Sequence, residues 1–119
     1  MNDYQGPVYE KSFEFALVII ELYKKLVDQK EYVLSKQLLR SGTSVGANVV
    51  EASAAYSKAD FAYRMSVASR EAREANWWLL LLKKSQLVSV ELNNEIESCG
   101  ELIKLLTSIV KTSQASLKK

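Results

Sequence analysis

One run of apolar and small residues, spaced alternately by four and three positions, constrains this 119-residue chain more than any other feature. The run consists of Phe61, Met65, Ala68, Ala72, Ala75, Leu79 and Leu82. Such spacing predicts a helix that packs along the seam of a left-handed helix bundle. Ser57 followed by Asp60 marks its start, because serine is a good N-cap and the acid falls in the first turn. We therefore expect a long helix over about residues 58–84.

Three other segments show the same helical period. Over about residues 8–28 the repeating positions, which we expect to face the core, are Phe13, Ala16, Leu17, Ile20, Tyr23 and Val27. Over about residues 34–55 they are Leu38, Gly42, Val45, Val49 and Ala52. Over about residues 90–113, with Ser89 as the expected N-cap, they are Leu92, Ile96, Cys99, Ile103, Leu106 and Val110. Short connections make neighbouring helices antiparallel, so we predict an all-α protein: one up-and-down antiparallel four-helix bundle domain spanning residues 1–119.

Gly42 and Gly46 lie one turn apart inside the second of these helices. Each glycine costs a helix about 1 kcal/mol relative to alanine, so an interaction has to offset that cost. We expect a neighbouring helix backbone to approach closely there, and the alanine-rich centre of the third helix is the candidate. The alternative is a break near Gly42 that divides the segment in two. We favour one continuous helix.

The residue types needed for most catalytic sites are missing. The chain contains no histidine, which removes the commonest general base, the commonest metal ligand and every histidine-activated nucleophile. Cys99 lies on the seam of the fourth helix and is expected to be buried rather than reactive. Carboxylates such as Glu74 and Glu95 fall off the assigned seams, whereas a metal site in a bundle needs them inside. We expect no enzyme activity and no catalytic, cofactor or metal site.

Three observations favour the cytoplasm and no membrane partner. The N-terminus shows no basic and apolar stretch of the kind found in signal peptides. The longest apolar run, Trp77–Leu82, is far shorter than the roughly 20 residues that span a bilayer. The single cysteine allows no internal disulfide and fits a reducing compartment.

Positive charge is concentrated in the middle of the chain, although the net charge is only +2. Residues 33–88 carry eight basic and four acidic side chains. All four arginines lie there: Arg40, Arg64, Arg70 and Arg73. Arginine presents a planar fork of donors suited to phosphate, so these four are the candidate nucleic-acid contacts. The alternative is that they pair with acids across helices or subunits.

Two further features allow a functional interpretation. A polar stripe, Ser41, Ser44, Asn48 and Glu51, runs beside the seam of the second helix next to Arg40. It is either a solvated face or, at Ser44, Asn48 and Glu51, a functional polar motif.

The second feature is the apolar run Trp77–Leu82, which encircles its helix. A bundle helix buries only one stripe, so Trp77 and Leu81 have no obvious place in the core. We expect them, with Trp78, to form an interface between copies of the chain, since exposed tryptophans are common binding hot spots. The alternative is an enlarged core end covered by the first interhelix connection.

Several stretches of the two middle segments form recognisable motifs. The first is residues 37–52, Gln-Leu-Leu-Arg-Ser-Gly-Thr-Ser-Val-Gly-Ala-Asn-Val-Val-Glu-Ala. The others are residues 57–61, Ser-Lys-Ala-Asp-Phe, residues 68–74, Ala-Ser-Arg-Glu-Ala-Arg-Glu, and Trp78-Leu79. Together they resemble a bacterial family of four-helix-bundle proteins, those encoded in intervening sequences of 23S ribosomal RNA genes. The resemblance covers about Phe13 to Val110, and accessory proteins of diversity-generating retroelements look like relatives.

This resemblance implies an up-and-down bundle, a homo-oligomer that is a ring of five (a pentamer) in characterised relatives, and a nucleic-acid role. The relatives that assist retroelements are strongly basic, whereas this chain carries only +2. Our first hypothesis is a non-enzymatic oligomeric bundle whose basic middle hairpin binds RNA or a nucleoprotein. The rival is a protein-interaction scaffold with no nucleic-acid affinity, and a distant third is an enzyme with a carboxylate site.

Overall fold

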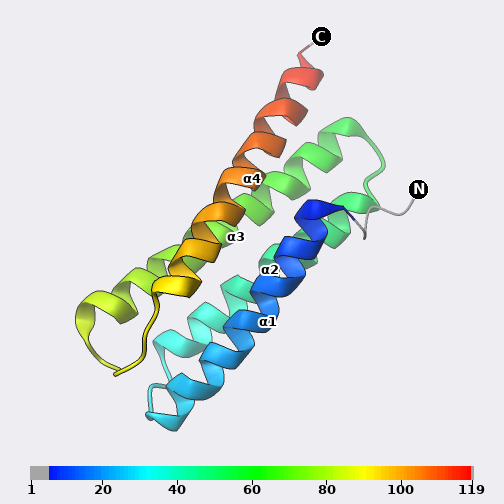
Figure 1. Cartoon of the computed structure of the whole chain (residues 1–119). Coiled ribbons are helices and arrows are strands. Elements are labelled where there is room, and N and C mark those ends of the chain that lie inside the picture. The colour runs from blue at the N-terminus through cyan, green and yellow to red at the C-terminus, as the bar shows by residue number, and fades with distance from the viewer. Residues whose placement is uncertain (1–5, 119) are drawn as a thin grey trace.

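The computed structural model describes residues 6–118, which form four helices joined by short connections, each antiparallel to the next (Figure 1). They are α1 (Pro7–Asp28), α2 (Leu34–Ser53), α3 (Lys58–Ser85) and α4 (Asn93–Leu117). Each helix packs against the next and α4 packs back on α1, so α1 and α3 lie on a diagonal of the bundle. The predicted all-α, up-and-down bundle is confirmed. The polar residues 1–5 that precede the predicted first helix lie outside the described residues.

The helix α3 begins where the sequence predicts, whereas α4 begins later than predicted. Ser57 Oγ accepts a hydrogen bond from the Asp60 backbone N–H at 3.1 Å. The helix α4 begins at Asn93 rather than near residue 90, and Ser89 is not its N-cap. Instead, the Ser89 N–H donates to Gln29 Oε1 at 2.7 Å, and Gln29 Nε2 donates to the Ser89 carbonyl oxygen at 3.2 Å. The α3–α4 connection is thereby fastened to the end of α1.

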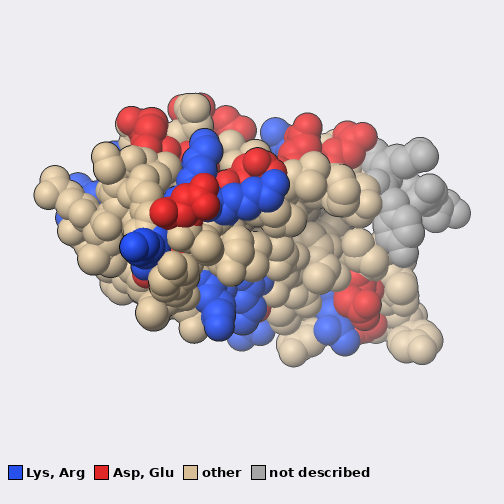
Figure 2. Space-filling view, turned by 90° about the horizontal axis from the view of Figure 1, so that it is seen from below, with Lys and Arg blue, Asp and Glu red and all other residues tan. Residues whose placement is uncertain are grey.

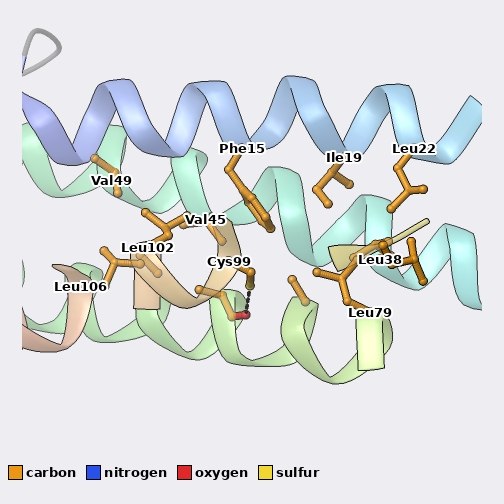
Figure 3. Close-up of a cluster of buried hydrophobic side chains, with 14 of the residues drawn as sticks. Phe15, Ile19, Leu22, Leu38, Val45, Val49, Leu79, Cys99, Leu102 and Leu106 are labelled. Atoms are coloured by element: carbon orange, nitrogen blue, oxygen red, sulfur yellow. Dashed lines mark hydrogen bonds between the residues drawn. The ribbon is translucent and has the colours of Figure 1, made fainter. Parts of the chain in front are cut away.

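Buried side chains from all four helices fill the centre of the bundle (Figure 3). The predicted seams of α2 and α3 are confirmed, with Phe61 half-buried at the edge of the core. In α4, Leu102 is fully buried while the expected Ile103 is partly buried against the cluster. The buried members from α2, α3 and α4 include Leu38, Val45, Val49, Met65, Ala68, Ala72, Ala75, Leu79, Leu82, Cys99, Leu102 and Leu106.

The expected buried face of α1 is wrong. Its buried residues are Ser12, Phe15, Ile19, Leu22 and Leu26. Phe13 and Leu17, from the predicted face, are 53% and 50% exposed. The helix carries two apolar lines, and helical periodicity does not say which of them faces inward.

Gly42 and Gly46 lie inside one continuous helix, as favoured, but they face α1 and not the alanines of α3. A Cβ atom at position 42 would lie 3.0 Å from both Cγ atoms of Ile19. A Cβ atom at position 46 would lie 3.5 Å from Ser12 Cβ, which is ordinary van der Waals contact. The close helix approach is therefore between α1 and α2, and it is tightest at Gly42.

We expect Gly42→Ala to destabilise the protein and Gly46→Ala to stabilise it. At position 42, overpacking against the fully buried Ile19 should cost about 1–3 kcal/mol, which outweighs alanine's helix-propensity gain of about 1 kcal/mol. At position 46 the same propensity gain meets no clash. Urea unfolding followed by circular dichroism measures both. Equal stability of the two variants would mean that Ile19 has room to move.

Candidate functional site

Arg40, one of the candidate nucleic-acid contacts, joins α2 to α3 through an ion-pair cluster. Its guanidinium contacts Glu74, and its Nη1 lies 3.3 Å from Glu71 Oε1. The Trp78 indole N–H donates to Glu74 Oε2 at 3.1 Å. The hydrogen bond from the Trp78 indole, followed by the bond from Arg40, lowers the pKa of the Glu74 carboxyl. The carboxylates of Glu74 and, to a lesser extent, Glu71 raise the pKa of the Arg40 guanidinium. Arg40 therefore pairs with acids across helices, which is the alternative to nucleic-acid contact for this arginine.

The other three arginines lie on α3 and have no carboxylate partner among residues 6–118. Arg64 Cζ is 5.7 Å from the centre of the Tyr63 ring, within the range of a cation–π contact. Arg73 Nη2 donates to Thr107 Oγ1 on α4 at 3.0 Å. Arg70 is exposed. These three charges are therefore available to an external anion.

The polar stripe of α2 bonds to its own helix. Ser44 Oγ donates to the Arg40 carbonyl oxygen at 2.7 Å, and Asn48 Nδ2 donates to the Ser44 carbonyl oxygen at 2.9 Å. Ser41 is buried, and its hydroxyl donates to a carbonyl one turn earlier. Glu51 is exposed. Because such bonds satisfy the side chains locally, Ser44 and Asn48 need no outside partner, while the fully buried Ser41 belongs to the core and not to a solvated face.

Two apolar faces stay exposed on α1 and α3, which are diagonal in the bundle. On α1, Phe13, Leu17 and Ile20 form one face, to which we refer as the α1 face. On α3, Trp77 is 57% exposed, as expected from the apolar run, while Leu81 and Trp78 are half-buried. Figure 2 shows wide uncharged areas between small groups of charges of both signs on one side of the molecule. The α1 face was missed in the sequence because it was assigned to the core.

Cys99 has the environment of a structural cysteine. Its thiol donates to the Ala72 carbonyl oxygen at 3.3 Å, as the dashed line in Figure 3 shows. Burial raises the pKa of this thiol to about 12, so it stays protonated and is a poor nucleophile. Within residues 6–118, no three His, Cys, Asp or Glu side chains are grouped so as to hold a metal ion. None of the helices in that range combines the length and apolar character needed to cross a bilayer.

An open apolar groove of ≈1110 Å³ lies at the end of the bundle where α1 begins. Val8, Phe61, Met65 and Ile109 line it together with several small side chains. Within residues 6–118, its lining contains no carboxylate and no thiol, and Lys58 is the one cation there. The groove offers apolar contact but no groups for acid–base or nucleophilic chemistry.

We expect acid to weaken the parent protein more than a Glu74→Gln variant. The pKa of Glu74 is lowered in the folded state, so the stability linked to it is present above the ordinary glutamate pKa and lost as pH falls through the lowered value. The variant has no such carboxylate to protonate. Unfolding free energies at about pH 7 and pH 3 measure the difference. Glu97→Gln, at an exposed position of α4, is the matched control; if the parent and Glu74→Gln lose stability equally, the Arg40 cluster adds nothing.

Comparison with known proteins agrees with this fold. The family model described as 23S rRNA-intervening sequence protein matches residues 5–108. A crystal structure of a protein of unknown function from the S23 ribosomal protein family of Bacteroides thetaiotaomicron VPI-5482 is 48% identical, with a TM-score of 0.83, over 87% of this chain and 98% of that chain. No curated protein matches the chain. The family resemblance seen in the sequence is confirmed, and the chain belongs to the 23S rRNA-intervening sequence protein family.

Proposed function

We propose that this chain is a non-enzymatic binding protein that assembles with copies of itself and binds RNA. The observation that carries the proposal is the pair of exposed apolar faces on α1 and α3. Exposed apolar side chains clustered on a helix face favour burial against another molecule. The arginines of α3 that lack carboxylate partners supply the charge for RNA.

The positions of the two faces favour a head-to-tail contact. The α1 face and Trp77 lie on helices that are diagonal in the bundle. A two-fold symmetric dimer would cover one of these faces twice and leave the other exposed, whereas a head-to-tail contact covers both and closes into a ring when the rotation allows. A ring of five is the number that the family resemblance suggests.

Charges of opposite sign lie beside Phe13 and beside Trp77, while the exposed Lys24, paired with Glu21, continues the α1 face at its other end. Glu10 and Glu14 are exposed next to Phe13 on α1, and Arg70 is exposed on the same side of α3 as Trp77. Complementary charges of this kind favour one orientation of docking. The same pairing supports the rival function, a protein-interaction scaffold, because an Arg70 covered by a neighbouring subunit no longer reaches RNA.

We expect the parent to be an oligomer and both Leu17→Glu and Trp77→Glu to reduce its mass in solution, because each buries a charge in the proposed contact. Size exclusion coupled to light scattering measures this. Tyr32→Glu is the matched control, since Tyr32 is 56% exposed but lies in the α1–α2 connection. A monomeric parent at micromolar concentration would contradict the proposal.

Mixing the two variants tests the head-to-tail geometry. Leu17→Glu keeps an intact α3 side, and Trp77→Glu keeps an intact α1 face. One good contact can therefore form between them, so the mixture should yield a dimer of one copy of each. A mixture that stays monomeric would indicate that each face packs on its own kind.

RNA binding should be measurable and steeply dependent on salt. Phosphate contacts release counterions, so several of them should weaken affinity by roughly tenfold to a hundredfold between about 50 and 200 mM salt. Fluorescence anisotropy with a labelled single-stranded RNA measures both points. No binding at the lower salt would leave the scaffold as the function.

A further inference from the structure

A second, smaller hollow of ≈520 Å³ lies between α3 and α4 and shares Thr112 with the lining of the apolar groove. One wall is Arg73 of α3, and the other is a stretch of α4. The residues from α4 are Ile103, Lys104, Thr107, Ser108, Lys111 and Thr112. We refer to these residues with Arg73 as the α3–α4 hollow.

Among the residues that the structure describes, the lining of the α3–α4 hollow carries three cations and no carboxylate. Arg73, Lys104 and Lys111 form no ion pair with any residue in the described range 6–118. The acids nearest in sequence are engaged elsewhere: Glu74 contacts Arg40 on the α2 side of α3, and Glu101 lies 3.9 Å from Lys11. Three neighbouring positive charges without internal compensation are a local anion site on a chain with a net charge of only +2.

The geometry of the hollow suits phosphate. The hydrogen bond of 3.0 Å from Arg73 Nη2 to Thr107 Oγ1 orients the guanidinium and leaves its other N–H groups to donate. The ammonium groups start from Lys104 and Lys111, which are about 10.5 Å apart along the helix axis. The hydroxyls of Ser108 and Thr112 add neutral donors. Cations at both ends of such a span can contact more than one phosphate of a chain.

We propose that the α3–α4 hollow is a phosphate-binding site that holds the backbone of RNA. This inference rests on the proposed function. It moves the main RNA contact from the hairpin of α2 and α3 to a site that also needs α4. Arg73 supplies a bidentate fork for one phosphate, and the two lysines neutralise the phosphates on either side. The site reads charge and spacing and makes no base contact, so binding is independent of sequence.

The test compares Arg73→Gln/Lys104→Gln/Lys111→Gln with a control of equal charge, Lys25→Gln/Lys36→Gln/Lys84→Gln, whose lysines are exposed and outside any ion pair in the described chain. Losing three single-strand phosphate contacts should lower the slope of log affinity against log salt by about 2. Between 50 and 200 mM salt, the parent's affinity should therefore fall by about sixteenfold more than the hollow variant's affinity. The control should keep the parent slope. Equal slopes in both variants would overturn the site.

Two further measurements separate this site from the proposed function. Titration with inorganic pyrophosphate should shift the amide NMR signals of Thr107 and Ser108, and an unshifted spectrum would overturn the site even if RNA binds. A shifted spectrum without RNA binding would keep the phosphate site and reject RNA as its ligand. Polyglutamate that competes as well as RNA would assign the hollow to an acidic protein instead. Lys104→Gln/Lys111→Gln alone, which keeps the Arg73–Thr107 bond, should lose part of the slope and guards against misfolding of the triple variant.

Discussion

The close approach of Ile19 to Gly42 determines how α1 sits on the rest of the bundle. A Cβ atom at position 42 would be only 3.0 Å from the Ile19 side chain, so glycine leaves the room that this packing uses. Ser12 against Gly46 continues the same line one turn further along α2. With that side of α1 against α2, the line through Phe13 and Leu17 has to point outward. The exposed α1 face is thus a consequence of two glycines on another helix.

The acids Glu71 and Glu74 lie on one side of α3, and the cation Arg73 lies on another. Arg40 of α2 forms ion pairs with Glu71 and Glu74, and the Trp78 indole donates a further hydrogen bond to Glu74. Arg73 lies on the side of α3 that faces α4, and no acid among residues 6–118 lines the hollow there. A net charge of +2 therefore conceals a local imbalance that composition cannot show. For anion binding, the positions of the unpaired cations matter more than the total number of charged residues.

The sequence predicts those parts of the fold in which a local signal has only one interpretation. The α3 seam is such a part, because its alternating apolar positions are confirmed and Ser57 caps the helix as expected. The inner face of α1 is not, since its two apolar lines have the same period and the choice depends on Gly42, which lies on another helix. The arginines were visible as candidates, but their partners were not.

The missed lysines show the same limit. Lys104 and Lys111 look like any solvated positions of a helix, and Arg73 is joined to their helix by a bond between residues 34 positions apart. Packing of α3 on α4 creates their hollow.

Trp77 follows Arg73 by one helical turn, so the hollow borders the surface proposed to contact the next subunit. A ring would repeat the hollow once per subunit, and each phosphate contact after the first would form at a high effective concentration. By linkage, an RNA that spans two subunits stabilises their contact as much as the contact strengthens RNA binding. In such a ring a weak charge on each chain would be sufficient, because assembly would supply the multiplicity that a single +2 subunit lacks.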